Sequence, residues 1–187
     1  ELPSYVDALE RGWSANTMDD DAGRRELAVI RADPDGFLAS LDDRDGSGLP
    51  IRLPDGSVVP RIPGFHRWMW DGEFCGRIGF RCVPGTEELP PHVLGHIGYA
   101  VVPWKRRRGH ATEALRLLLD EIAGEGLRWV DITTDPDNVA SQRVIGANRG
   151  ELVERFTYLP AYGGGTGLRY RIRLPRPTVT PGVRPPA

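Results

Sequence analysis

The chain of 187 residues has only two cysteines, Cys75 and Cys82, and no long apolar run. Two cysteines cannot build the disulfide framework of a small secreted domain, and their spacing does not fit a zinc site, so we expect two reduced thiols. No apolar stretch approaches the roughly 20 residues that cross a bilayer, and the first residues lack the features of a signal peptide. The sequence therefore predicts a cytoplasmic protein with no membrane contact.

An excess of charge of either sign is also missing. The 24 basic and 26 acidic residues give a net charge of −2, which provides no general attraction to nucleic acid. A phosphate-binding Gly-x-x-x-x-Gly-Lys-Ser/Thr motif is absent too, which disfavours nucleotide hydrolysis. The length predicts one domain with one core, which we place at residues 1–174. The remaining residues, 175–187, are rich in proline, and we expect an extended or disordered tail.

The first half of the chain changes from helical to strand patterning. Residues 1 to about 45 have apolar residues at helical spacing, which predicts two or three short helices. The pairs Asp55-Gly56 and Asp71-Gly72 are typical of hairpin turns, and the second lies between residues 67–70 and 74–81. This half is therefore predicted to contain an antiparallel meander, followed by a loop at 87–91.

The second half alternates strands and helices. An apolar run at 93–102 predicts a strand, residues 111–122 an amphipathic helix and residues 127–134 another strand. A strand, helix and strand in so short a span imply a parallel pairing with a right-handed crossover. A helix at 139–148 and strands at 152–156 and 168–174 complete an α/β fold. Its central sheet is expected to be mixed, largely antiparallel and flanked by helices.

A basic loop, Arg106-Arg107-Arg108-Gly109-His110-Ala111, lies between the predicted strand and helix. The start of a helix exposes unpaired backbone N–H groups and a partial positive charge, which together bind anions. Gly109 permits a close approach, and Ala111 is small for the same reason. A solvated basic turn is the alternative interpretation, but the position between strand and helix favours an anion site. Binding of DNA through residues 105–108 is disfavoured by the acidic balance of the chain.

Two segments, His96 to Leu115 and Asn138-Val139-Ala140-Ser141, resemble the acetyl-CoA-binding core of the GNAT acetyltransferases. The likeness is close over residues 92–156 and looser over 65–81. Within the family, the chain as a whole resembles a bacterial subgroup of predicted acetyltransferases. The resemblance implies a GNAT fold whose sheet is splayed at an acyl-CoA cleft. It also implies an N-acetyltransferase that moves an acetyl group from acetyl-CoA to a primary amine of a small molecule or peptide. The resemblance further implies that the amine attacks directly in a ternary complex and that no metal takes part.

The same resemblance implies the residues that hold the cofactor. Residues 99–102 would form a bulged strand edge, and the backbone N–H near Val101 would stabilise the oxyanion. Main-chain N–H groups from Arg107 to Thr112 would bind the pyrophosphate, and Asn138 the pantetheine. For Asn138 a helix N-cap is an equal alternative, and both roles can coexist. The implied cofactor-binding set is Val101, Val102, Arg106, Arg107, Arg108, Gly109, His110, Ala111, Thr112, Asn138 and Ser141.

The implied catalytic residues are His96 and Tyr99. Many relatives have a glutamate where this chain has His96, and a histidine titrates near neutral pH, so it can act as general base. A packed structural histidine is the alternative, and Glu73 and His66 are weaker candidates. The tyrosine that relatives place beside the leaving thiolate is Ile145 here. Tyr99, Tyr158 or Tyr162 would then donate the proton, or the thiolate leaves unaided.

The sequence does not determine the acceptor amine or the oligomeric state. Phe65, Trp68, Trp70 and Tyr162 could line an acceptor pocket for an apolar amine or pack in the core. A non-catalytic acyl-CoA sensor, whose proline-rich tail engages a partner, is the alternative function, because the usual glutamate and tyrosine are missing. The sequence also leaves a homodimer open.

Overall fold

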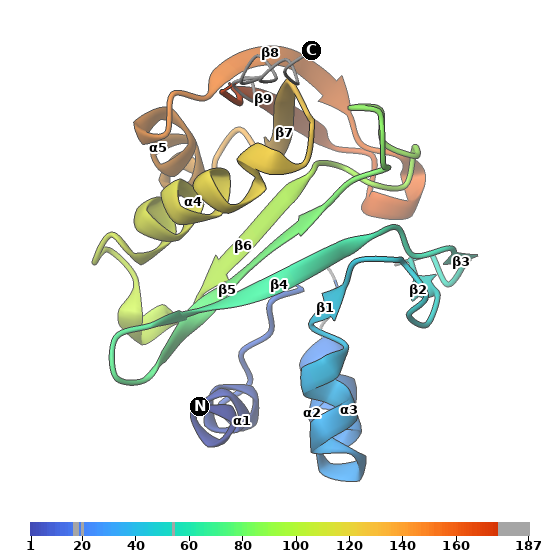
Figure 1. The fold of residues 1–187 in the computed structure, drawn as a ribbon, viewed down its shortest axis with the longest axis vertical. Coiled ribbons are helices and arrows are strands. Elements are labelled where there is room, and N and C mark those ends of the chain that lie inside the picture. The colour runs from blue at the N-terminus through green and yellow to red at the C-terminus, as the bar shows by residue number, and fades with distance from the viewer. Residues whose placement is uncertain (17–18, 20, 54, 176–187) are drawn as a thin grey trace, which may run out of the picture.

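The computed structural model describes residues 1–16, 19, 21–53 and 55–175, and its helices and strands are shown in Figure 1. The helices are α1 Leu2–Glu10, α2 Ala22–Ala32, α3 Pro34–Ala39, α4 His110–Glu121 and α5 Val139–Ala147, with 3-10 turns at Pro103–Lys105, Ile122–Gly124 and Pro160–Tyr162. The strands are β1 Asp42–Asp43, β2 Ile51–Arg52, β3 Val58–Val59, β4 Gly64–Trp70, β5 Phe74–Arg81, β6 Ile97–Val101, β7 Trp129–Thr134, β8 Glu151–Thr157 and β9 Thr166–Arg173. Residues 176–187 of the predicted tail lie outside the described residues.

The main sheet has the strand order β1-β4-β5-β6, and all its pairings are antiparallel. The predicted hairpin is confirmed, because β4 and β5 are joined at Asp71-Gly72 and Gly72 has a φ of 107°. The Asp55-Gly56 pair likewise joins β2 to β3. The register is continuous from Phe80 opposite Ile97 to Gly76 opposite Val101, so the bulge expected at residues 99–102 is not found in this pairing.

The second sheet has the order β7-β9-β8, again with antiparallel pairings. The predicted parallel pairing of residues 93–102 with 127–134 is wrong as a ladder, since β6 and β7 belong to different sheets in the described part of the chain. One backbone bond remains at their start, from the His96 N–H to the Asp131 carbonyl (2.7 Å). The predicted α/β class, with antiparallel sheets flanked by helices, is confirmed.

Helices cover both faces of the main sheet, with α4 and α5 on one side and α1, α2 and α3 on the other (Figure 1). The amphipathic pattern predicted for α4 is confirmed, because Leu115 and Leu118 are buried in a core that also contains Ile78 and Phe80. On the opposite face, aromatic rings from α1, α3 and the sheet form a second core. There the Tyr5 ring stacks on Phe37, with centroids 5.8 Å apart. None of the helices in the described segments has the length and apolar character that crossing a bilayer requires.

Candidate active site

A groove of about 1390 Å³ runs over the face of the main sheet and into the space between the two sheets. Its floor comes from β4, β5 and β6, and its walls come from the β2–β3 hairpin, the end of β7 and residues 158–166. Of the predicted site residues, Tyr99, Asn138 and Ser141 line this groove. The structure therefore brings the ends of β6 and β7 and the start of α5 to one cavity.

The edge of β6 that faces β7 carries backbone groups without partners. In an antiparallel pair, alternate residues direct their N–H and C=O groups toward the neighbouring strand. The bond from the Val102 N–H to the Cys75 carbonyl (2.9 Å) fixes this alternation, so Tyr99 and Val101 direct their N–H groups away from β5. In the described chain neither N–H has an acceptor. An extended ligand can therefore hydrogen-bond along this edge as an added strand.

The basic loop after β6 has an unusual backbone. Arg107 and Gly109 both have positive φ values, 61° and 84°, and Gly109 is the N-cap residue of α4. The first backbone bond of the helix runs from the Glu113 N–H to the Gly109 carbonyl (3.0 Å), and the N–H groups of 107–112 have no acceptor among the described residues. Successive N–H groups around left-handed residues form a concave anion site. The predicted anion-binding loop therefore has the backbone geometry that its role requires.

Ion pairs attach this loop to the β4–β5 hairpin. The Lys105 ammonium lies 2.8 Å from Asp71 and 3.0 Å from Glu73, and His110 Nε2 lies 3.4 Å from Asp71. The hydrogen bond from Lys105 lowers the pKa of Asp71 to about 2. Glu73, a candidate base in the sequence, is thus a partner of Lys105 and does not line the groove.

Asp71 also belongs to a group of potential metal ligands. Its carboxylate, the Cys75 thiol and the His110 imidazole have donor atoms within 4.8 Å of one another. The carboxylate is already paired with the Lys105 ammonium, and burial raises the pKa of the Cys75 thiol to about 11. A metal binds the thiolate form of cysteine, which this environment disfavours. These residues therefore suit the contact between the hairpin and the loop better than they suit a metal site.

Asn138 occupies the predicted N-cap position of α5. Its Oδ1 accepts a hydrogen bond from the Ser141 N–H (3.0 Å), which satisfies one of the free groups at the helix start. Its Nδ2 has no partner in the described chain, and the residue lies at the groove wall. The cap is therefore present, and the amide donor stays available for a ligand.

Tyr99 connects β6 to the start of α5. Its hydroxyl lies 2.9 Å from the Ser141 hydroxyl and donates to the Ser141 carbonyl at 3.3 Å. Burial raises the pKa of Tyr99 to about 12, so the phenol stays protonated at neutral pH. A protonated hydroxyl at the mouth of the gap between the sheets can donate a hydrogen bond or a proton to a ligand there.

His96 is fully buried at the point where the two sheets meet. Its Nδ1 accepts a hydrogen bond from the Asp131 N–H (2.9 Å), so in the neutral ring the proton is on Nε2. No free lone pair remains to take a proton from a substrate. Burial also lowers the pKa of His96 to about 4. This bonding pattern does not suit the predicted general base and gives His96 a structural role.

The remaining tyrosines and aromatic residues divide between the groove and the core. Tyr158 and Tyr162 line the groove, and the Tyr162 hydroxyl donates to the His92 carbonyl (2.7 Å). Phe65 is buried in the first core and also borders the groove, whereas Trp68 stacks on Tyr5 with centroids 4.9 Å apart. Trp70 is exposed and lies outside the groove. Of the four aromatics proposed for an acceptor pocket, Tyr162 therefore fits that position best.

The structure draws attention to two groove residues, Arg81 and His66, that the sequence pattern does not emphasise. The sequence pattern does not single out Arg81 at the end of β5, and it indicates His66 in β4 only as a candidate base. Burial lowers the pKa of His66 to about 3, so its ring is neutral near pH 7. The alternation Arg77-x-Gly79-x-Arg81 is the signal that could have found this region, because it places two cations on one face of a strand.

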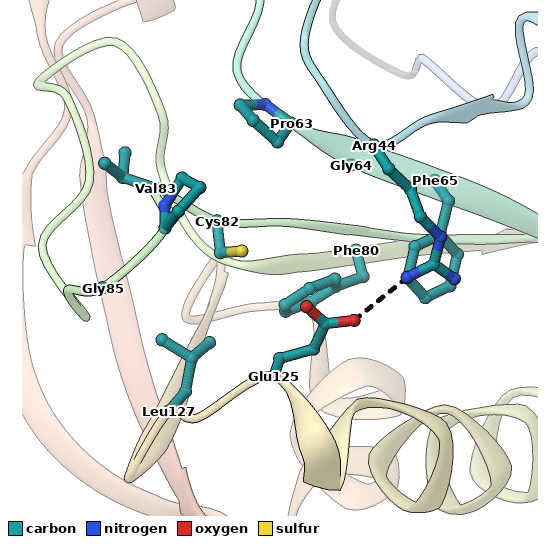
Figure 2. A pocket seen from close by; sticks show the side chains of 11 residues that line it. Arg44, Pro63, Gly64, Phe65, Phe80, Cys82, Val83, Gly85, Glu125 and Leu127 are labelled. Carbon is teal, nitrogen blue, oxygen red and sulfur yellow. Dashed lines mark hydrogen bonds and ion pairs between the residues drawn. The ribbon is translucent and has the colours of Figure 1, made fainter.

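A second and smaller hollow, of about 140 Å³, lies beside the start of β4 and the end of β5 (Figure 2). Phe65, Phe80, Cys82 and Leu127 give it an apolar lining, and an ion pair between Arg44 and Glu125 (3.0 Å) borders it. None of the predicted cofactor-binding or catalytic residues contributes to this hollow. The free N–H groups and the large groove are therefore the candidate site.

An open strand edge followed by a helix-initiating anion loop suits an extended ligand that carries a phosphate group. Residues 58–149 match the family model described as an acetyltransferase (GNAT) domain. This region of the chain belongs to the GNAT acetyltransferase superfamily, as the resemblance predicted.

Solved structures of acetyltransferases have the same fold at low sequence identity. The microcin C7 self-immunity acetyltransferase MccE, solved with acetyl-CoA and AMP, is 11% identical with a TM-score of 0.61, over 91% of this chain and 86% of that one. An acetyl transferase from Salmonella typhimurium that modifies the N-terminal serine of ribosomal protein L7/L12 is 15% identical with a TM-score of 0.59, over 92% and 91%. A putative ribosomal-protein-serine acetyltransferase from Vibrio cholerae is 14% identical with a TM-score of 0.55, over 92% and 88%. No curated protein matches this chain.

Proposed function

We propose that the protein is an N-acetyltransferase that moves the acetyl group of acetyl-CoA to a primary amine of a small molecule or peptide. The observation that carries this proposal is two sets of free N–H groups in the described part of the chain, at Tyr99 and Val101 on the edge of β6 and at residues 107–112 of the following loop. The strand edge suits the amide groups of pantetheine, and the loop suits a doubly charged pyrophosphate. The MccE structure, which contains acetyl-CoA, supports this choice of acyl donor.

The N–H of Val101 is the proposed oxyanion donor. When the amine attacks the thioester, negative charge develops on the carbonyl oxygen, and a fixed N–H directed at it lowers the barrier. Asn138 Nδ2 would donate to a pantetheine carbonyl, with the Ser141 hydroxyl beside it. Val102, which is fully buried, holds the end of β6 in place through its bond to Cys75.

Tyr99 is the proposed proton donor to the departing thiolate. Its hydroxyl is protonated at neutral pH and lies next to Ser141 at the gap that the pantetheine arm would enter. The ammonium proton of the acceptor leaves to water in the open groove before the attack. The second proton, which the nitrogen loses when the amide forms, returns through water to the Tyr99 phenolate. His96 acts through the backbone, because it fixes the start of β6 against Asp131.

Direct attack by the amine, with no acetyl-enzyme, is supported by the positions of the two thiols. Cys75 and Cys82 are both buried, and burial raises the pKa of each. Neither thiol lines the groove. A covalent relay would need an accessible thiolate, and the described chain offers none.

The test combines calorimetry with a thiol-release assay. Acetyl-CoA should bind the purified protein, and coenzyme A should be released in the presence of some members of a panel of amines and peptides. Mass spectrometry of protein incubated with acetyl-CoA alone should show no acetylated cysteine. Absence of any heat on titration with acetyl-CoA would overturn the proposal. Binding without thiol release across the whole panel would instead establish the non-catalytic sensor.

A further inference from the structure

We propose that the acceptor amine also carries an anionic group, a carboxylate or a phosphate, which binds to Arg81 on the floor of the groove with His66 beside it. This inference rests on the proposed function and adds the chemical class of the acceptor. It starts from a hollow in the sheet, formed at His66, Gly79, Arg81 and Gly98, whose positive charge serves neither the packing of the fold nor the binding of the cofactor.

Two glycines create the hollow. Across three strands, His66 lies opposite Gly79, and Gly79 lies opposite Gly98. A Cβ atom at Gly79 would come within 2.3 Å of His66 Nδ1, and one at Gly98 within 3.3 Å of Arg81 Nη2. The missing side chains therefore allow the imidazole and the guanidinium to lie against the sheet, at the bottom of the groove.

Arg81 has no acidic partner in the described part of the chain. Its Nε donates to the Gly95 carbonyl (2.8 Å), which fixes the plane of the guanidinium, and its Nη atoms have no acceptor there. Two other arginines of the groove are neutralised, since Arg77 lies 2.6 Å from Glu26 and Arg61 lies 3.7 Å from Asp43. A partly buried, unpaired guanidinium is unusual, because its desolvation is not offset by an opposite charge.

His66 lies in this cationic environment as a neutral ring. Neither of its ring nitrogens has a hydrogen-bond partner in the described segments, and its Nδ1 is buried. Besides burial, the nearby charges of Arg77, Arg81, Arg61 and Arg67 lower its pKa. An anion bound to Arg81 would offset this repulsion and could accept a hydrogen bond from His66. A planar guanidinium with two free donor nitrogens matches the oxygens of a carboxylate or a phosphate.

The strand also limits the distance between the two ends of the acceptor. Arg81 lies against Gly98, and the proposed oxyanion donor is the N–H of Val101, three residues further along β6. At a rise of about 3.3 Å per residue these positions are about 10 Å apart. The acceptor amine and the anion are therefore expected to be separated by several bonds, as in an ω-amino acid, and not by one carbon as in an α-amino acid.

The test compares matched acceptors and matched variants. The probes are ω-amino acids of increasing chain length, their carboxamides, and an ω-aminoalkyl phosphate. The unmodified protein should prefer each acid of suitable length over its amide by about 10- to 100-fold in kcat/KM. In Arg81→Gln this ratio should fall to about one, in Arg81→Lys it should be intermediate, and in the exposed control Arg173→Gln it should not change. Equal rates for acids and amides in the unmodified protein, or an unchanged ratio in Arg81→Gln, would overturn the proposal.

A second variant and a binding measurement keep the proposal testable if Arg81→Gln does not fold or if no acetyl transfer is detected. Gly98→Val keeps Arg81 and its bond to Gly95 but fills the hollow, so it should also remove the preference for acids. With coenzyme A saturating the loop, calorimetry with acetate and with inorganic phosphate should show weak binding that Arg81→Gln abolishes, and the tighter of the two identifies the anion. Such binding without any acetyl transfer would overturn the proposed function but keep the anion site. Transfer to amines that does not depend on Arg81 would overturn the anion site and keep the function.

Discussion

His96 and Asp131 form two hydrogen bonds with each other, and these bonds join the two main sheets at one point. The His96 N–H donates to the Asp131 carbonyl at 2.7 Å, and the Asp131 N–H donates to His96 Nδ1 at 2.9 Å. Beyond this point the edges of β6 and β7 separate, and the groove enters the space between them. The imidazole thus replaces a backbone carbonyl as acceptor at the place where the strands part.

The first prediction concerns removal of this imidazole. His96→Ala leaves the buried Asp131 N–H without an acceptor and creates a cavity, so it should lower the free energy of unfolding by about 2–4 kcal/mol. His96→Asn supplies a carboxamide oxygen and should recover part of this loss. Urea denaturation measures both, with the partly exposed His110→Ala as control. The pH profile of the residual turnover should keep its shape, and a selective loss of activity with unchanged stability would restore His96 as the base.

The second prediction concerns stability in acid. An unfolded histidine has a pKa of about 6.5, whereas the folded pKa is about 4 for His96 and about 3 for His66. Below pH 6.5 the unfolded state binds more protons than the native state, so stability falls as the pH falls. Between pH 7 and pH 5 the contribution of His96 should decrease by about 2 kcal/mol. Urea midpoints at the two pH values test this, and His96→Asn should show a smaller decrease. A midpoint that does not change with pH would contradict the buried, neutral state.

The strands of the second sheet show why the local pattern could predict elements but not their pairing. Residues 127–134 have the composition of a buried strand, and β7 does form there. It pairs with β9, where Asp131 lies opposite Arg171 and the two side chains form hydrogen bonds of 2.8 and 2.9 Å. The sequence contains both residues, but only the register brings them together. The predicted parallel ladder with residues 93–102 is wrong because β6 and β7 share only the bond from the His96 N–H to the Asp131 carbonyl in the described chain, and no ladder follows it.

The site divides in the same way between local and long-range features. The loop at 106–112 could be predicted, because a strand, a glycine and an amphipathic helix follow each other directly in the chain. The surroundings of Arg81 could not, since His66, Gly79 and Gly98 lie on three strands and meet only through two registers. The role of His96 likewise depends on Asp131, which is 35 residues away in the sequence.

The third prediction tests the left-handed residue at the start of α4. Gly109 has a φ of 84°, and a Cβ there would meet nothing within 4 Å, so a substitution acts through backbone strain and not through a clash. Gly109→Val should cost about 1–3 kcal/mol of strain in the loop and raise the apparent KM for acetyl-CoA about tenfold or more. Gly124→Ala is the matched control, because its surroundings are equally open and its φ is outside the positive region. Steady-state kinetics with unchanged KM in Gly109→Val would refute the loop assignment.

The fourth prediction concerns the phenol at the mouth of the gap. Tyr99→Phe removes the proposed proton donor and should lower kcat by about 10- to 100-fold with a smaller effect on the KM for acetyl-CoA. Because the pKa of Tyr99 is about 12, its proton should not limit the rate between pH 7 and pH 9. Tyr170→Phe is the control, since its hydroxyl also bonds to α5, at Gln142 Oε1 (3.2 Å), but lies outside the groove. Equal kinetics of the two variants would exclude Tyr99 as the acid.

The fifth prediction separates the two roles of Asn138. Asn138→Ala loses the bond to the Ser141 N–H and should destabilise the protein by about 1 kcal/mol. Asn138→Asp keeps an oxygen acceptor and adds a favourable negative charge at the helix start, so its stability should be preserved. It lacks the amide donor, however, and should raise the KM for acetyl-CoA about tenfold if Nδ2 binds pantetheine.

Asp33→Ala provides the comparison for this prediction, because Asp33 caps α3 through the Gly36 N–H (2.9 Å) and does not line the groove. This variant should lose a similar amount of stability in urea denaturation without any change in KM. An increase in KM for Asn138→Ala alone would mean that the cap positions the helix and that the amide makes no contact with the cofactor. An increase for both Asn138 variants, with Asp33→Ala unaffected, would assign Nδ2 to the ligand, because the aspartate preserves the cap and removes only the donor.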